Sequence, residues 1–104
     1  MIKHIQNENF KEEVLDNSKV VVVDFFATWC MPCKMLTPVL EKVSESRADF
    51  EIVKVDVDEA QELAMKYQIQ AVPTLLVFKD GEEVNRFSGF MDEETLVNKI
   101  EESI

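Results

Sequence analysis

The sequence predicts an α/β protein built on a mixed sheet of about five strands, with helices on both faces. Segments with strand and helix patterns alternate through most of the chain, which is typical of parallel strands joined by crossover helices. Near the C-terminal end, two β-rich segments flank Asp80-Gly81, a pair that favours a tight hairpin and therefore an antiparallel edge. The 104 residues suffice for one hydrophobic core, and no Pro-, Gly- or Ser-rich linker divides them. We therefore expect a single domain over residues 1–104.

The first part of the chain predicts two strands separated by a helix. Residues 2–5 are expected to form a short edge strand, and Asn7 is the expected N-cap of a helix that extends to about Asp16. The apolar face of this helix consists of Phe10, Val14 and Leu15. The segment 19–27 is nearly continuously apolar, which indicates a strand buried on both faces.

A long helix is predicted next. Pro32 suits its first turn, where the missing N–H is not needed, and helical spacing continues to about Arg47. The inward positions are Leu36, Val39, Leu40 and Val43. Pro38 lies inside this helix, where we expect it to remove one backbone hydrogen bond and to kink the axis. The alternation over Phe50–Asp56 predicts the following strand.

The remaining segments predict a short helix, a hairpin and a final helix. The short helix is marked by Ala60, Leu63, Ala64 and Tyr67. Pro73 then precedes the β-rich run Thr74–Phe78, and Asp80-Gly81 turns the chain into a strand over Glu83–Ser88. Asp92 is the expected N-cap of the last helix. Its inward residues are Leu96, Val97 and Ile100.

Composition and charge restrict the classes of function. Hydrophobic residues make up 46% of the chain and charged residues 31%, an ordinary balance for a globular protein. The formal net charge of −10 disfavours nucleic acids and anionic membrane surfaces as partners, because both carry phosphate charge. The charge also favours solubility. Its use in steering partners is the alternative, because the segment Phe25–Leu40 contains no acidic residue and carries only Lys34.

The N-terminal residues predict a cytosolic location. They contain no basic segment followed by an apolar run, so we expect no signal peptide. The longest apolar stretches, Val20–Val23 and Leu75–Phe78, are too short to cross a bilayer. Thiols are kept reduced in the cytosol, so a cysteine pair there is rarely a structural crosslink.

Cys30 and Cys33 form a Cys-x-x-Cys motif that has several interpretations. Half of a zinc site is disfavoured, because tetrahedral zinc needs four ligands and the only histidine, His4, lies near the other end of the chain. We expect His4 at the surface or in the edge strand, and we expect no metal. A structural disulfide across so small a ring would constrain the unfolded chain little. An inert pair and a redox-active pair remain.

A redox role fits the position of the pair between a buried strand and a helix. Cys30 would begin the helix, where unpaired N–H groups and the macrodipole favour a thiolate. The thiolate is the form that attacks a disulfide. Cys33 lies one turn later, close enough to attack a mixed disulfide on Cys30, and Pro32 stiffens the turn between them. In a chain with a βαβ pattern, this arrangement is typical of a thioredoxin-like motif.

Residues 23–34, Val-Asp-Phe-Phe-Ala-Thr-Trp-Cys-Met-Pro-Cys-Lys, resemble the active-site segment of the thioredoxin family. Further matches follow in the family's order through essentially the whole chain. They are Pro38, Lys54 with Asp56, Ala71-Val72-Pro73-Thr74, Phe78-Lys79-Asp80-Gly81 and Ser88-Gly89. The resemblance implies the thioredoxin fold, a five-stranded mixed sheet flanked by four helices.

The resemblance also implies catalytic roles. Cys30 would be the attacking nucleophile and Cys33 the resolving cysteine, with Pro32 between them. Asp24 would be a buried acid that relays a proton to Cys33, and Lys54 would be its partner. An acid in an apolar strand is costly to bury and needs such a reason. A solvent-facing or edge position is the alternative for Asp24, and an ordinary exposed strand position is the alternative for Lys54.

A client-binding surface is implied as well. Pro73 would be a cis-proline that faces the disulfide, and the backbone of Val72 would pair with an extended segment of the client. The expected apolar rim of this surface consists of Trp29, Met31, Ala71, Val72, Gly89 and Phe90. Ordinary packing is the alternative for Met31 and Phe90.

The implied activity is the reduction of disulfides in cytosolic protein clients by dithiol exchange. Electrons would come from a separate donor of the thioredoxin reductase type, with no bound cofactor, and we expect a monomer. Three residues depart from the family's pattern: Met31 replaces the usual Gly, Phe26 stands where many members have Trp, and Ala71 replaces a smaller or polar residue. Because residues between the cysteines tune the redox potential, an oxidant or isomerase is an alternative. A binding module with incidental redox activity is another.

Overall fold

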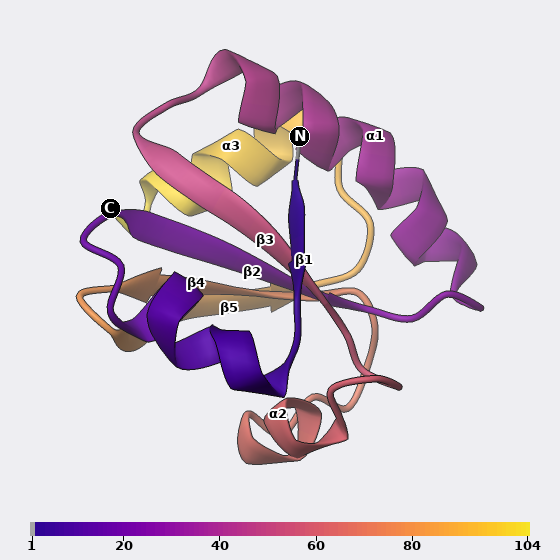
Figure 1. Cartoon of the computed structure of the whole chain (residues 1–104). Coiled ribbons are helices and arrows are strands. Elements are labelled where there is room, and N and C mark those ends of the chain that lie inside the picture. Colours follow the sequence, from indigo (N-terminus) through magenta and orange to yellow (C-terminus); the bar gives the residue numbers. More distant parts are fainter. Residues whose placement is uncertain (1) are drawn as a thin grey trace.

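A computed structural model describes residues 2–104 of the protein, and its centre is one five-stranded sheet. The strands follow the spatial order β1-β3-β2-β4-β5. Their bounds are β1 (Lys3–Ile5), β2 (Val20–Phe26), β3 (Phe50–Asp56), β4 (Thr74–Lys79) and β5 (Glu82–Ser88). β1, β3 and β2 run parallel, whereas β4 and β5 pair antiparallel to their neighbours (Figure 1). The predicted mixed sheet is confirmed, with residues 2–5 supplying the edge strand β1.

Helices cover both faces of the sheet. α1 (Met31–Ser46) and α3 (Glu93–Glu101) pack on one face, and α2 (Gln61–Lys66) lies on the opposite face together with an N-terminal helical segment (Figure 1). Counting that segment, four helical elements flank the sheet, as the family resemblance implies. Pro38 lies inside α1 as predicted, and the kink there stays a prediction.

The N-terminal helical segment differs from the predicted α-helix. It consists of a 3₁₀ turn, η1 (Asn7–Asn9), and a π-helical stretch, η2 (Lys11–Leu15). The prediction of Asn7 as N-cap is wrong, because the helical turn begins at Asn7 itself. The Asn7 side-chain oxygen instead accepts the backbone N–H of Leu63 in α2, at 3.2 Å. The Asn7 side-chain oxygen, which was predicted to cap the local helix, is therefore used in a tertiary hydrogen bond instead.

β2 is the central strand and is buried along its entire length. Its seven residues pair with β3 on one side, and five of them also pair with β4 on the other. A strand between two neighbours and two helical layers has no face toward water, which is why its sequence is apolar throughout. Asp24 is the single charged residue of β2, and its place in the centre of the sheet fixes its burial.

The hairpin between β4 and β5 and the last helix, α3, lie where the sequence predicted them, and local interactions explain both positions. Asp80 and Gly81 both have positive φ, +53° and +80°, the combination that suits a two-residue turn between antiparallel strands. The Asp92 side chain accepts the backbone N–H of Thr95 at 2.9 Å and so caps α3. α2 occupies the predicted position between Ala60 and Tyr67.

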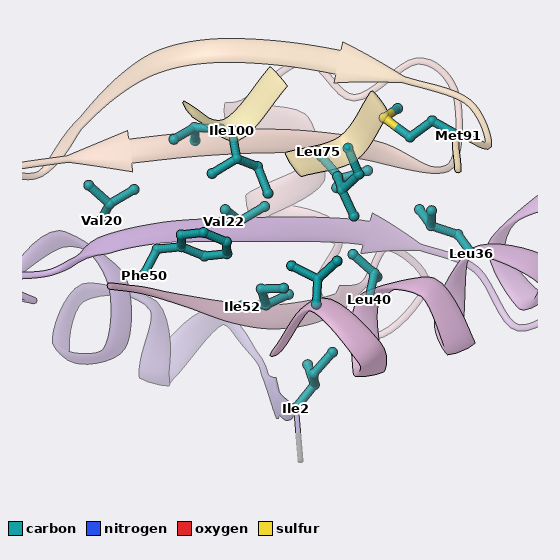
Figure 2. Close-up of a cluster of buried hydrophobic side chains, with 13 residues drawn as sticks. Ile2, Val20, Val22, Leu36, Leu40, Phe50, Ile52, Leu75, Met91 and Ile100 are labelled. Carbon is teal, nitrogen blue, oxygen red and sulfur yellow. The ribbon is translucent and has the colours of Figure 1, made fainter. Parts of the chain in front are cut away.

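Two apolar clusters fill the spaces between the sheet and its helices. The cluster beneath α1 and α3 is shown in Figure 2, where Leu36 and Leu40 point from α1 toward the sheet, which contributes Val22 and Ile52 to the same cluster. The cluster on the opposite face is rich in aromatic rings, with Phe10, Tyr67 and Phe78 in mutual contact. These clusters hold the ends of β2 and α1, which carry the cysteines, in fixed relative positions.

We expect Leu40→Ala to lower the free energy of unfolding by about 2–5 kcal/mol, because Leu40 is fully buried between α1 and the sheet and its loss leaves a cavity. Met65→Ala is the control, since Met65 is 78% exposed on α2, and a change within about 0.5 kcal/mol is expected there. Urea denaturation followed by Trp29 fluorescence measures both. Equal losses in the two variants would contradict this assignment of the core.

Candidate active site

Both cysteines lie where β2 ends and α1 begins. Cys30 is the N-cap of α1, and its sulfur accepts the backbone N–H of Cys33 at 3.2 Å. The two residues are joined by a disulfide, with their Cα atoms 5.3 Å apart. Pro32 lies in the first turn of the helix as predicted, where a residue without an N–H loses no hydrogen bond.

The N-cap position gives Cys30 an environment that favours negative charge. The free N–H groups of the first turn point toward it, and the helix dipole adds a partial positive charge at the same end. No acidic residue lies in that first turn to oppose the effect. Once the disulfide is reduced, the N–H of Cys33 is therefore placed to donate to a thiolate on Cys30.

The loop before β4 lies against the disulfide. The Val72–Pro73 peptide bond is cis, as the family resemblance implies, and the carbonyl oxygen of Val72 lies 3.6 Å from the sulfur of Cys30. The N–H of Gly89 donates to the carbonyl of Pro73 at 2.9 Å, and Gly89 itself has a φ of +90°. The hydroxyl of Thr74 donates to the carbonyl of Ala71 at 2.6 Å. These bonds fix the loop from both of its sides.

Several of the predicted rim residues are apolar and exposed at the surface. Trp29, Met31 and Phe90 are large apolar residues with 69%, 62% and 46% of their surface exposed. A pocket of about 350 Å³ opens beside the loop, lined by Trp29, Val57, Ile69, Gln70, Ala71 and Val72. The structure thus brings three of the six predicted rim residues into one pocket. Gly89 joins them through its bond to Pro73, whereas Met31 and Phe90 lie outside the pocket lining.

Asp24 lies behind the cysteines in the middle of β2. It has no exposed surface, which excludes the solvent-facing alternative, and its two carboxylate oxygens have no hydrogen-bond partner among residues 2–104. The nearest cation is Lys54, whose Nζ lies 4.0 Å from Oδ2. Burial raises the pKa of Asp24 to about 7, and the positive charge of Lys54 acts in the opposite direction. Such a carboxyl group exchanges protons near neutral pH.

Lys54 is also buried, with only 6% of its surface exposed, so the alternative of an ordinary surface lysine is wrong. Its ammonium donates to the hydroxyl of Thr37 at 2.8 Å. It lines a pocket of about 260 Å³ together with Phe26, Ala27, Thr28, Cys33, Lys34 and Thr37. Lys54 therefore connects the surroundings of Asp24 to a pocket that Cys33 also lines.

Sequence reasoning missed two residues that support these groups. The Thr37 hydroxyl holds Lys54, and the Asp58 carboxylate accepts the indole N–H of Trp29 at 2.9 Å. Both contacts join segments far apart in the chain, so neither residue carries a local signal in the sequence. His4 lies exposed on β1, and within residues 2–104 no group of three or more His, Cys, Asp or Glu side chains is arranged to hold a metal ion.

Comparison with known proteins agrees with this geometry. The family model named Thioredoxin matches residues 1–102. The chain belongs to the thioredoxin family. It is 42% identical to a thioredoxin from Mycoplasmoides gallisepticum, over 91% of this chain and 95% of that protein. It is 43% identical to a thioredoxin from Chlamydia trachomatis, over 96% of each chain. It is 46% identical to Thioredoxin Y2, chloroplastic, from Arabidopsis thaliana, over 95% of this chain and 60% of that protein.

Family membership and the disulfide between the two motif cysteines define the class of activity. The protein is a thiol–disulfide oxidoreductase, and the pair Cys30–Cys33 is its redox-active centre. The described helices include none that is both long enough and apolar enough to span a bilayer.

The raised pKa of Asp24 predicts a pH-dependent contribution to stability. The folded protein holds the proton up to about pH 7, whereas the ordinary pKa of an aspartate carboxyl, which applies in the unfolded chain, is 3.8. Unfolding therefore releases a proton between these two values, and stability falls as the pH rises through that window, by about 1.4 kcal/mol per pH unit. We expect Asp24→Asn to remove this slope, so that the variant gains stability relative to the parent between pH 4 and 7.

Urea denaturation of both proteins at a series of pH values measures this difference. Other titrating groups contribute equally to the two proteins and cancel in the comparison. A difference that stayed constant from pH 4 to pH 8 would show that the Asp24 carboxyl is ionised throughout this range.

Proposed function

We propose that this protein reduces disulfides in protein clients through Cys30 and Cys33 and is then re-reduced by a separate reductase. The observation that carries the proposal is the N-cap position of Cys30, whose sulfur accepts the N–H of Cys33 at 3.2 Å. A thiolate at this position is stabilised by the helix terminus before any client binds. The proposed setting is the cytosol, where thiols are kept reduced.

Client binding is proposed to use the backbone of Val72 and the apolar rim around it. Val72 is half-buried beside the disulfide and follows the exposed Ala71, so an extended client segment can approach this edge. Strand-like pairing supplies affinity through the main chain and leaves the client sequence little restricted. Trp29, Met31, Gly89 and Phe90 are proposed to contact the apolar side chains that flank the client's cystine.

The first chemical step is nucleophilic. The Cys30 thiolate attacks one sulfur of the client disulfide and forms a mixed disulfide. The client's own sulfur–sulfur bond breaks, and its second sulfur leaves as a thiolate that takes a proton. The carbonyl oxygen of Val72, the residue before Pro73, lies 3.6 Å from the Cys30 sulfur, and Pro73 is proposed to limit the directions from which a client sulfur can approach.

The second step releases the client. Cys33 is the proposed resolving cysteine, and its thiol must lose a proton before it attacks Cys30. Asp24 is the proposed acceptor of that proton, because its raised pKa allows uptake near neutral pH. Attack by Cys33 then forms the Cys30–Cys33 disulfide and frees the second client thiol. Two electrons have passed from the cysteine pair to the client.

The oxidised pair must then be reduced again. A donor of the thioredoxin reductase type is the proposed source of these electrons, delivered by the same exchange chemistry in reverse, so that this chain needs no bound cofactor of its own. Because Cys30 and Cys33 are the chain's two cysteines, intermolecular disulfides would consume the active site. We therefore propose that the protein works as a monomer.

We expect Cys33→Ser to trap client proteins as mixed disulfides on Cys30, because the step that releases them is blocked. Affinity capture followed by non-reducing electrophoresis measures this. Cys30→Ser is the control and should trap none, since Cys33 is buried at 1% exposure. A Cys33→Ser protein that traps no client, together with a Cys30→Ser protein that keeps the biological function, would instead identify a binding module.

An equilibrium redox titration of Cys30–Cys33, followed by Trp29 fluorescence, tests the direction of electron flow. We expect a midpoint of about −270 mV, the value typical of thioredoxins that act as reductants. A midpoint higher by many tens of millivolts would identify an oxidant or isomerase and would assign Met31, which replaces the usual Gly, a large effect on the potential.

A further inference from the structure

Three ionisable side chains form a row across the sheet on the face that α1 covers. His4 on β1 pairs in register with Lys54 on β3, and Lys54 pairs with Asp24 on β2. Register partners on neighbouring strands project to the same face of a sheet. Exposure decreases along the row, from the exposed His4 to Lys54 at 6% and Asp24 at 0%. The row leads from the sheet edge to the buried carboxylate.

The Phe26 ring contacts two members of this row, Lys54 and His4. Phe26 follows Asp24 by two residues on β2 and so lies on the same face. The ammonium of Lys54 lies over its ring, 4.5 Å from the centroid, which is a favourable cation–π geometry. The His4 ring packs against it edge to face, with centroids 5.6 Å apart and an interplanar angle of 81°.

The position of the Lys54 ammonium is therefore fixed by Thr37 and Phe26 and not by a hydrogen bond to the Asp24 carboxylate. Its Nζ donates to Thr37 at 2.8 Å and lies over Phe26, whereas Oδ2 of Asp24 is 4.0 Å away, beyond hydrogen-bonding distance. The alternative place for the ammonium is water in the pocket that Lys54 lines with Cys33. The attraction between opposite charges weakens with distance, so the position of Nζ decides how strongly it favours the ionised carboxylate.

We propose that Phe26 and His4 are positioning residues that hold the Lys54 ammonium beside Asp24 during thiol–disulfide exchange. The inference rests on the relay proposed above for Asp24. The face of the Phe26 ring keeps Nζ from turning into the pocket, and His4 keeps that ring in place from the sheet edge. Phe26 also packs in one buried cluster with Ala27 and both cysteines, so its ring contacts Lys54 and belongs to the surroundings of the reacting pair as well.

Other charged groups near this site come from each neighbouring element. Lys34 on α1 lines the same pocket, and Glu41 lies one helical turn after Thr37. Asp56 on β3 is the register partner of Phe26, and Leu75, the partner of Asp24 on β4, carries no charge. The substitutions of Phe26 and Phe87 below leave all of these groups and His4 in place, so a change in the titration of Asp24 in those variants reports on Lys54.

The test is an NMR titration of the Asp24 carboxyl in the oxidised full chain. We expect Phe26→Leu to move the midpoint to higher pH by about half a unit or more, because the ammonium loses its ring and turns into the pocket. Phe26→Tyr and Phe26→Trp keep a ring beneath Nζ and should retain the parent midpoint. Phe26→Met also removes the ring and serves if the Leu variant does not fold.

Phe87→Leu is the matched control. Phe87 is a half-buried phenylalanine on β5 whose ring also lies beneath a lysine, with Nζ of Lys99 at 5.9 Å from the centroid. It lies in the cluster beneath α1 and α3 and contributes to neither the pocket nor the cysteine cluster. We expect no change in the Asp24 midpoint. An equal shift in Phe87→Leu would overturn the assignment to Phe26.

His4 is tested by two substitutions. His4→Ala removes the edge contact and should shift the midpoint in the same direction as Phe26→Leu, by a smaller amount. His4→Phe keeps an aromatic edge against Phe26 and should retain the parent value. An unchanged midpoint in His4→Ala would overturn the role of His4.

The failure of this inference can be separated from failure of the proposed relay. An unchanged or lowered midpoint in Phe26→Leu overturns the positioning role, whatever the rates show. The rate of client disulfide reduction is then measured against pH in the same variants, and its profile should shift with the Asp24 midpoint. A midpoint that shifts without the rate profile would support the positioning role and overturn the proton relay.

Discussion

The complete burial of β2 is the constraint on which the rest of the structure depends. A central strand has neighbours on both edges and helical layers on both faces, so each of its side chains must lie in apolar surroundings or find a partner. Six of its seven residues are apolar, and Asp24 is the exception. The same rigid strand delivers the chain to Cys30 at one end of α1. The position of the redox pair and that of the buried Asp24 are thus both fixed by β2.

The active site is made where separate parts of the chain meet at this strand. The start of α1, which follows β2 in the chain, contributes both cysteines. Val72 and Pro73 come from the loop before β4, and β3 and α2 lie between the two segments in the chain. Hydrogen bonds within that loop and to Gly89 hold it against Cys30. Because both sides of the site are anchored to paired strands, the proposed client would meet a surface whose backbone is already in place, which reduces the ordering cost of binding.

Much of this arrangement could be predicted from sequence, because local chemistry determines it. The apolar run of β2, the proline in the first turn of α1 and the Asp80-Gly81 hairpin each act through neighbouring residues. The prediction for the N-terminal segment was wrong because the Asn7 side chain accepts a hydrogen bond from α2. No local sequence pattern can indicate a hydrogen bond between residues 56 positions apart. The contacts of Phe26 with Lys54 and His4 could not be predicted from the sequence for the same reason, because they depend on strand order and register.

The distance between Lys54 and Asp24 suits the proposed proton relay, because it leaves the pKa of the buried carboxyl near neutral. A hydrogen-bonded pair would stabilise the ionised carboxylate and lower its pKa, so Asp24 would then hold no proton near neutral pH. With no lysine nearby, desolvation alone would keep the acid protonated, and it would accept no proton from Cys33. At 4.0 Å the lysine offsets part of the desolvation, and the pKa lies at about 7. Thr37 and Phe26 both contact the ammonium at this distance, so the proposed relay depends on them as well as on the packing of the sheet.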